Sequence, residues 1–339
     1  MKKFLTALLV LLTVAGALSL SFAMPSGILT DAAQEAYMEA QMGDDDFFDP
    51  DLFLKNTVSC GMSGGGVPDD FEDFAPEGTY DLPWDTSEGM TLNPAGFTEN
   101  GYRDDSVVVE VYNDFVNDSI VHVAYIKVAS PTQLRTKVAG STQYTSVMAK
   151  KVNAVVAING DYYTDRDGGV IVRQGKSARQ QKNSSKDSLL IDKNGDFHIV
   201  KAGDSKGLAE AVKCEAGIAN AFYFGPAYII DGEIQPTPAK YAFQMDSAQP
   251  RTAIGQVGPL TYVFVTVEGR QSGRSEGMDY DQMAAYMAEL GCVQAFNLDG
   301  GNSSTFVFNG TVYRGQNAKE RDVKDIIYIA GAVDPASWQ

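Results

Sequence analysis

The chain is poor in the residues that most metal and thiol sites use. It holds three cysteines and two histidines in 339 residues, so a zinc centre has no Cys/His cluster to build on. The cysteines, Cys60, Cys214 and Cys292, allow at most one disulfide, and the sequence leaves its pairing open. His122 and His198 lie in alternating strand-like runs, which favour structural roles over activation of a cysteine nucleophile.

Positive charge is scarce in one region only. The net charge is −17, yet residues 24–106 hold 19 acidic and 2 basic residues, whereas residues 107–339 hold 25 acidic and 23 basic. No basic stripe dominates, which argues against a nucleic-acid partner. The glycine-rich stretch "DGGNSS" lacks the Gly-Lys-Ser/Thr of a phosphate loop, so nucleotide binding is not expected.

Long hydrophobic runs are absent after the first residues. Lys2 and Lys3 precede the apolar stretch Phe4–Leu20, and Ser21-Phe22-Ala23 is a small-x-small cleavage site. We predict a signal peptide over residues 1–23, export to the extracellular space or cell envelope, and no stable membrane insertion after cleavage near Ala23. A retained anchor is the alternative, because the stretch is only just long enough to span a bilayer.

Residues 24–96 form an acidic segment with glycine, proline and scattered aromatics. This composition predicts a partly flexible leader or spacer, with a short helix around Ala32 to Gln41. Two alternatives remain: its aromatic residues dock on the following domain, or its acids bind calcium loosely. Apart from such calcium, we expect no cofactor.

The pattern from residue 97 to 339 predicts one α+β domain, in which a large mixed or antiparallel β-sheet core packs with a few helices. Hairpins are expected at 106–129, at 189–200 around Asn194-Gly195 and at 227–234 around Asp231-Gly232, and two further strands are expected within 252–269. Further strands are expected at 153–159, 292–298, 304–310 and 325–333. Helices are expected at 142–152 and 278–291, the second capped by Asp279 and ended by Gly291.

Polar clusters follow two of these expected strands. "AINGDYY" places Asn159, Gly160 and Asp161 at a strand exit, and "FNLDGGNSS" places another set there: Asn297, Asp299, Gly300, Gly301, Ser303 and Ser304. Strand ends present polar groups to a cleft, and glycines let backbone N–H groups approach an anion. The alternative is an ordinary Asp-Gly turn in each place.

Other charged residues stand near strand ends. Glu268 and Arg270 follow one strand, while Arg251 and Arg321 are further cations able to hold a phosphate or carboxylate. "DKNGD" resembles the start of a calcium loop but lacks the bidentate Glu at the twelfth position, so a hairpin explains it better. Asp161, Asp165 and Asp167 are a second cation alternative, and we predict no metal ligands.

Taken in order, five stretches resemble the phosphodiester glycosidase family from about residue 102 to the C-terminus. They are "AINGDYY", "FGPAYIIDGEI", "PRTAIG", the block from "VEGRQSG" to "NLDGGNSSTF", and "ERDV". The chain departs from the family pattern in three places. It has Asp161-Tyr162-Tyr163 where relatives have Gly-Phe-Phe, Glu268 where they have Asp, and Asn302 where they have a third glycine. These departures concern substrate identity more than fold.

The resemblance implies a secreted hydrolase that cleaves a sugar-1-phosphodiester at the anomeric C–O bond and releases the sugar and a phosphomonoester. Its substrate would be a cell-envelope or extracellular glycan, and its oligomeric state is open. Cleavage builds oxocarbenium character at C1, which a carboxylate must stabilise or attack. We assign this role to Asp299, with Glu268 as the second carboxylate. The expected substrate contacts are Asn159, Asp161, Arg251, Arg270, Asn297, Gly300, Gly301, Ser303, Ser304 and Arg321. Two alternatives are a non-catalytic envelope-glycan-binding protein and a calcium-stabilised structural or adhesion module.

Overall fold

The computed structural model describes residues 71–338, apart from 72, 87, 163–167, 181–184, 242–244 and 314–319. These residues all belong to one compact unit of the chain, Phe48–Gln339. The expected signal peptide, the expected helix near Ala32 to Gln41, Cys60, Asp165 and Asp167 lie outside the described residues. Among the described residues, no helix has the length and apolar character needed to cross a bilayer.

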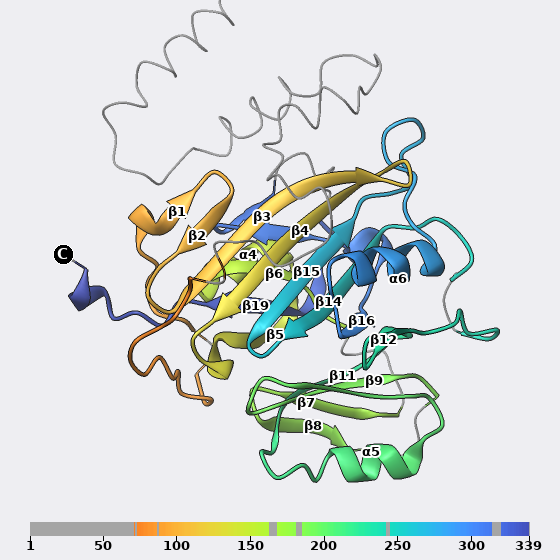
Figure 1. Ribbon diagram of the computed structural model, residues 1–339, viewed down its shortest axis with the longest axis horizontal. Helices are drawn as coiled ribbons and strands as arrows, with labels where there is room; N and C mark the ends of the chain where they lie inside the picture. The colour runs from red at the N-terminus through yellow and green to blue at the C-terminus, as the bar shows by residue number, and fades with distance from the viewer. Residues whose placement is uncertain are drawn as a thin grey trace, which may run out of the picture. The chain divides into compact units, whose positions relative to one another are not determined.

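The described strands form three antiparallel sheets (Figure 1). Sheet A has nine strands in the order β1 (Phe97–Thr98), β2 (Gly101–Arg103), β3 (Val107–Val116), β4 (Ser119–Val128), β15 (Thr261–Val267), β14 (Arg251–Gly258), β16 (Gln294–Asn297), β12 (Ala227–Ile230) and β13 (Glu233–Ile234). Sheet B has the order β18 (Thr311–Val312), β17 (Phe306–Phe308), β6 (Ala154–Asn159), β19 (Val323–Ala330) and β5 (Leu134–Gln143). Sheet C has the order β10 (Phe197–Val200), β9 (Ser188–Asp192), β11 (Ile218–Tyr223), β7 (Val170–Arg173) and β8 (Lys176–Gln180).

The helices of the described residues are short. They are α4 (Thr145–Lys151), α5 (Ser205–Ala211) and α6 (Tyr280–Glu289), with 3-10 turns at Pro94–Gly96, Pro131–Gln133, Gly301–Ser303 and Pro335–Ser337. Helix α6 begins at a capping box, in which Asp279 accepts from the Gln282 backbone and Gln282 accepts from the Asp279 backbone. The α+β class, the three expected hairpins, the two strands expected within 252–269 and the two expected helices are confirmed, although α4 begins three residues later than expected because β5 continues to Gln143.

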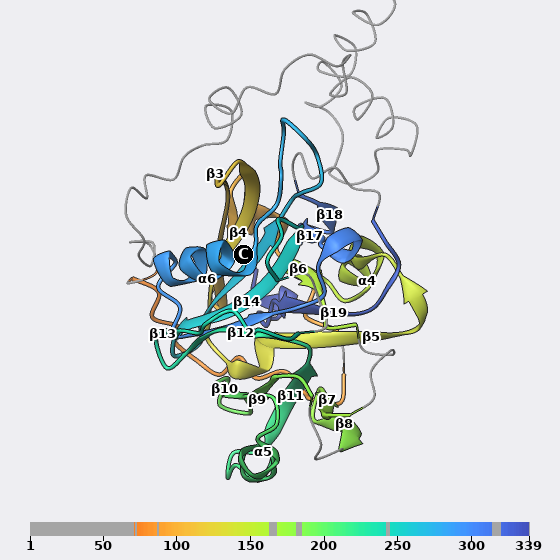
Figure 2. The same cartoon turned by 90° about the vertical axis from the view of Figure 1, so that its right-hand side faces the viewer.

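Sheet A lies between α6 on one face and sheet B on the other, and α4 covers the far face of sheet B (Figure 2). Alternation along the strands supplies both faces, because neighbouring residues point to opposite sides. On β4, Val123 packs toward α6 and Ala124 packs toward sheet B. The core between the two sheets includes Val109, Ile126 and Phe264 from sheet A and Ile158, Phe306 and Ile327 from sheet B.

The described part of the acidic segment contacts the sheets. Phe71 and Phe74 are buried in the core beneath α6, and Leu82 is buried beside α4. Lys127 donates to the carbonyl of Phe71 at 2.7 Å, and buried Arg135 donates to the carbonyl of Pro83 at 2.9 Å. Phe71, Phe74, Leu82 and Pro83 thus contact the domain that the sequence predicts from residue 97.

Candidate active site

The turn between β16 and β17 connects sheet A to sheet B. It contains the 3-10 segment Gly301–Ser303, and its first residues are hydrogen-bonded to the backbone of both sheets or of residues next to them. Leu298 N donates to Thr252 O at 2.9 Å on the sheet A side, and Asp299 N donates to Gly160 O at 3.2 Å at the end of β6. The predicted turn between strands therefore exists, but it crosses from one sheet to the other instead of closing a hairpin.

Asn159 fixes this turn from within the core. Its side chain is fully buried, and Nδ2 donates to Asp299 O at 2.7 Å and to Gly160 O at 3.2 Å. Its Oδ1 accepts from Thr252 Oγ1 at 3.0 Å and from Thr305 N at 3.1 Å. All four hydrogen-bonding positions of this amide are filled. Asn159 thus joins β14, the two ends of the turn and β6, and it does not line the pocket described below.

Asp299 and Arg321 meet although they are 22 residues apart. Arg321 Nη2 donates to Asp299 Oδ2 at 2.7 Å and also contacts Ser303 Oγ. The Arg321 guanidinium lies over the ring of Tyr162, 5.4 Å from its centroid. The side chain of Asp299 is 14% exposed and that of Arg321 41% exposed. This carboxylate is therefore accessible, oriented and paired with a cation.

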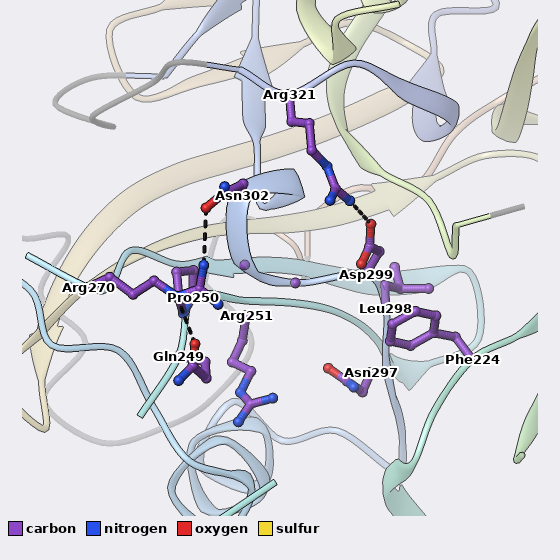
Figure 3. Close-up of a pocket in the computed structure, with 12 residues that line it drawn as sticks. Phe224, Gln249, Pro250, Arg251, Arg270, Asn297, Leu298, Asp299, Asn302 and Arg321 are labelled. Atoms are coloured by element: carbon purple, nitrogen blue, oxygen red, sulfur yellow. Dashed lines mark hydrogen bonds and ion pairs between the residues drawn. The ribbon is translucent and has the colours of Figure 1, made fainter. Parts of the chain in front are cut away.

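A pocket of about 390 Å³ opens at this ion pair (Figure 3). Its lining contains three arginines and one carboxylate, so its formal charge is positive. Such a lining favours an anionic ligand, because guanidinium groups bind phosphate and carboxylate oxygens in fixed geometry. The lining residues are Phe224, Gln249, Pro250, Arg251, Arg270, Asn297, Leu298, Asp299, Gly300, Gly301, Asn302 and Arg321.

Two polar side chains at the floor of the pocket are held by main-chain groups. Buried Arg251 donates from Nε to Met278 O at 2.9 Å and from Nη2 to Ser247 O at 3.0 Å. Asn297 donates to Gly225 O at 2.8 Å and accepts from Tyr228 Oη at 2.8 Å. Figure 3 shows both below Asp299. Their orientation is set before any ligand arrives, which is the arrangement that selective binding requires.

Glu268 lies apart from the pocket lining. Its carboxylate is buried between the sheets, with Oε1 2.9 Å from His122 Nε2 and Oε2 in contact with Arg274. His122 Nδ1 in turn lies 2.6 Å from Asn113 Oδ1. Burial raises the pKa of Glu268, but the hydrogen bond and charge of His122, followed by Arg274, outweigh burial and leave the pKa below its ordinary value. Glu268 is therefore a buried anion that anchors the loop carrying Arg270.

Asp161 also lies outside the pocket lining. It is 1% exposed, accepts from Arg173 Nη2 at 2.6 Å through Oδ1, and accepts from Tyr223 N at 2.8 Å through Oδ2. Arg173 bridges it to Asp325, with an Nη2–Oδ2 distance of 2.8 Å. Gly160 packs against this cluster so closely that a β-carbon there would overlap the Asp325 carboxylate. In the "NGD" motif, Gly160 and Asp161 thus pack in the buried cluster around Arg173, whereas Asn159 positions the turn that carries Asp299.

The structure brings most of the predicted site residues to one place. Among those predicted, the ones lining the pocket are Arg251, Arg270, Asn297, Asp299, Gly300, Gly301 and Arg321. Ser303 contacts Arg321 from a buried position, and Ser304 follows it in the same turn. The lining residues not predicted are Phe224, Gln249, Pro250, Leu298 and Asn302. All five lie within the motifs quoted above or directly next to them. Their closeness in sequence to those motifs could therefore have identified them as pocket residues.

Cys214, Cys292 and the "DKNGD" loop lie outside the pocket lining. Cys214 and Cys292 are free thiols, so no disulfide joins these two. Burial raises the pKa of the Cys292 thiol. "DKNGD" forms the turn of the β9–β10 hairpin, where Asp192 Oδ1 accepts from the backbone of Asn194 at 2.8 Å. Across the described ranges, no group of three or more His, Cys, Asp or Glu side chains is placed to hold a metal ion.

Comparison with known proteins places the chain in a family. A family model described as phosphodiester glycosidase matches residues 152–330. The SPbeta prophage-derived uncharacterized protein YomE of Bacillus subtilis (strain 168) is 29% identical over 191 residues, which are 54% of this chain and 29% of that protein. The N-acetylglucosamine-1-phosphodiester alpha-N-acetylglucosaminidase of Bos taurus is 40% identical over 62 residues, 18% of this chain and 11% of that enzyme. The aligned segments thus span less than a third of either relative.

A solved structure supports the same fold. It is the catalytic domain of the zebrafish N-acetylglucosamine-1-phosphodiester alpha-N-acetylglucosaminidase, auto-inhibited by its pro-peptide. The two chains superpose with a TM-score of 0.52 at 19% identity, covering 74% of this chain and 97% of that domain. The matched family region contains Asn159, the strands that flank the pocket, and the whole turn that carries Asp299. By this match the chain belongs to the phosphodiester glycosidase family.

Proposed function

We propose that this protein is an exported hydrolase that cleaves the anomeric C–O bond of a sugar-1-phosphodiester, of the GlcNAc-α-1-phosphodiester type, in envelope or extracellular glycans. The observation that carries the proposal is one oriented carboxylate, Asp299, in a pocket that also presents three arginines. The family match supports the reaction class. The export part rests on the signal-like residues 1–23.

The proposed chemistry follows from where charge develops. As the C1–O bond breaks, its electron pair leaves with the phosphate oxygen, and C1 gains oxocarbenium character that the Asp299 carboxylate stabilises or attacks. Water supplies the oxygen that ends on C1, and its protons pass to the products or solvent. The arginines offset the phosphate charge, so the leaving group needs little protonation. Asn297 and Phe224 line the pocket on the same side as Asp299 (Figure 3), and we assign them to the sugar side of the proposed site.

The test uses the full chain and a GlcNAc-α-1-phosphate methyl diester. Turnover is followed by phosphorus NMR, in which the diester signal is replaced by that of methyl phosphate while free GlcNAc accumulates. We expect turnover by the unmodified chain and at least about a 10³-fold loss for Asp299→Asn, because the carboxylate charge is lost while the shape is kept. Tight binding without turnover would instead identify a glycan-binding protein, and undiminished turnover in Asp299→Asn would overturn the carboxylate assignment.

Glu268 has a separate place in the proposal. Because its carboxylate contacts His122 and Arg274 and does not line the pocket, we propose that it acts as a positioning residue for the loop that carries Arg270. Glu268→Gln should then raise KM for the diester by about tenfold more than it lowers kcat, since substrate binding depends on the loop. A kcat loss equal to that of Asp299→Asn, with unchanged KM and an unchanged melting temperature, would make Glu268 the second catalytic carboxylate.

A further inference from the structure

The three arginines of the pocket differ in the partners that they already hold. Arg321 is paired with the Asp299 carboxylate, and buried Arg251 donates to two main-chain carbonyls. Arg270 is exposed and donates only to side-chain amides: Nε to Gln249 Oε1 at 2.8 Å and Nη1 to Asn302 Oδ1 at 3.1 Å. Within the part of the chain that the structure describes, no carboxylate lies within ion-pair distance of Arg270. Its charge is therefore available to a ligand.

The donors of Arg270 are only partly used. Two of the five guanidinium N–H groups donate to Gln249 and Asn302, and the other three have no protein acceptor among the described residues. Those three are shared by the two terminal nitrogens, Nη1 and Nη2. Two parallel N–H groups on adjacent nitrogens match two oxygens of a phosphate, which is the bidentate geometry that guanidinium groups favour.

The backbone around Arg270 is built to hold this orientation. Arg270 has a φ of 62°, a left-handed conformation that is uncommon for a residue with a long side chain. Its N–H donates to Glu276 O at 3.2 Å, which closes the loop. Gly301, with a φ of 61°, lies beneath the guanidinium, and a β-carbon at that position would stand 3.3 Å from Nη2. The glycine therefore leaves Nη2 close to the turn that carries Asp299.

Figure 3 shows Arg270, Gln249 and Asn302 on the side of the pocket away from Phe224 and Asp299. A sugar whose C1 faces Asp299 would direct its leaving group toward this side. We propose that Arg270, oriented by Gln249 and Asn302, binds the phosphate of the leaving group and makes the site select anionic leaving groups over neutral ones. This inference rests on the proposed function. It adds that Arg270 is the arginine that binds the phosphate, whereas Arg321 pairs with Asp299 and Arg251 donates to main-chain carbonyls.

The experiment compares two substrates that differ in the charge of the leaving group. One is the GlcNAc-α-1-phosphate methyl diester, and the other is the neutral 4-nitrophenyl α-glycoside of GlcNAc. Arg270→Ala should lower kcat/KM for the diester by about 10² while changing that for the neutral glycoside less than about threefold, because only the diester meets the lost charge. Arg270→Lys should restore about a tenth of the diester activity, since it keeps the charge and loses the fork.

Asn302→Asp is the matched second variant. Aspartate has nearly the same shape as asparagine but places a negative charge on the group that already accepts from Arg270. This charge would pair with the guanidinium and compete with the phosphate. We expect it to lower diester selectivity as Arg270→Ala does, whereas Asn302→Ala should change it less than about fivefold. Unaltered melting temperatures serve as the folding control. Equal losses on both substrates, or none on the diester, would overturn the inference.

A failure of the proposed reaction would be recognised separately. If the unmodified chain turns over neither substrate, binding of GlcNAc-1-phosphate by calorimetry replaces kinetics. Loss of that binding in Arg270→Ala and Asn302→Asp, with binding retained in Asn302→Ala, would support Arg270 as the phosphate contact without catalysis. Equal binding by all variants would overturn it.

Discussion

Gly160 joins two aspartate–arginine clusters of opposite character. Its C=O accepts from Asp299 N, and its N–H donates to Asp325 O at 2.9 Å. On one side Asp299 pairs with Arg321 at a pocket, with side-chain exposures of 14% and 41%. On the other, Arg173 bridges Asp161 and Asp325 with exposures of 5% or less. The same residue types thus form an accessible ion pair in one place and a buried structural cluster in the other, and the difference between the two is desolvation.

Burial determines the charge balance of the two clusters. The buried cluster holds two carboxylates and one guanidinium, and buried carboxylates require such a partner to be tolerated. Burial raises the pKa of Asp325 to about 7, although Arg173 lowers it, and Asp161 adds to the rise. The exposed pair carries no such constraint, because solvent screens its charges. The pocket lining carries an excess of positive charge, with three guanidinium groups and one carboxylate.

We expect the largest difference between the two clusters in enzymatic activity. Asp299→Asn should reduce turnover of the phosphodiester by about 10³-fold or more with little change in melting temperature. Asp161→Asn, which alters a buried group outside the pocket lining, should keep activity within about tenfold while lowering the melting temperature. Kinetics and circular dichroism melts of both variants decide this. A larger activity loss in Asp161→Asn than in Asp299→Asn would place the chemistry at the other cluster.

We expect a smaller difference between the two clusters in the free energy of unfolding. Arg173→Met should lower the free energy of unfolding by about 3–5 kcal/mol, because it leaves Asp161 and Asp325 buried without a cation. Arg321→Met, the matched change in the exposed pair, should cost no more than about 1 kcal/mol. Urea unfolding followed by tryptophan fluorescence measures both. Similar losses for the two variants would show that burial does not distinguish the clusters.

Substitutions of Asn159, next to the Gly160 junction between the two clusters, should have a smaller effect on stability and kcat. Asn159→Ala removes four hydrogen bonds and leaves buried partners unsatisfied, so we expect a stability loss of about 1–3 kcal/mol. Because the Asp299 carbonyl loses its donor, kcat should also fall by about tenfold or more. Asn159→Asp keeps the shape but cannot donate to Asp299 O when ionised, and should reproduce the kcat loss. Unchanged kcat in both variants would remove the positioning role.

The smallest expected effect is a pH dependence of stability. The pKa of Asp325 is raised in the native protein to about 7, above the ordinary value of 3.8. Between these two values the native state binds more protons than the unfolded state, so the Asp325 contribution to stability falls as pH rises from about 4 to 7. Asp325→Asn removes this term, and its stability relative to the unmodified chain should increase from pH 5 to pH 8. A difference that is constant with pH would contradict the raised pKa.

Local features were predictable from the sequence because short-range rules produce them. Asn194-Gly195 forms a hairpin turn as expected, and Asp279 caps α6 as expected, since both depend on residues within a few positions. The motif around Asp299 was also recognisable as a strand-end turn. The pairing of β16 with β14 and of β17 with β6 was not, because nothing in either strand specifies which distant strand it joins.

Side-chain direction decided which predicted residues reach the pocket. Glu268 follows Val267, which packs beneath α6, so alternation turns Glu268 toward sheet B and His122. Asp161 follows Gly160 and points into the Arg173 cluster. Asn302, which departs from the family pattern, lines the pocket and accepts from Arg270. Each of these outcomes depends on contacts between strands far apart in the chain.

The sequence alone determined the α+β class, the hairpins, the helix caps and the family, because these follow from periodicity, turn chemistry and ordered motifs. Only the tertiary structure decided that Asp299 and Arg321 form the accessible pair, that Asp161 and Glu268 are buried, and that Arg270 donates to two side-chain amides among the described residues. The physical reason is that desolvation and charge pairing depend on which strand ends the fold brings together, and sequence separation does not limit that choice.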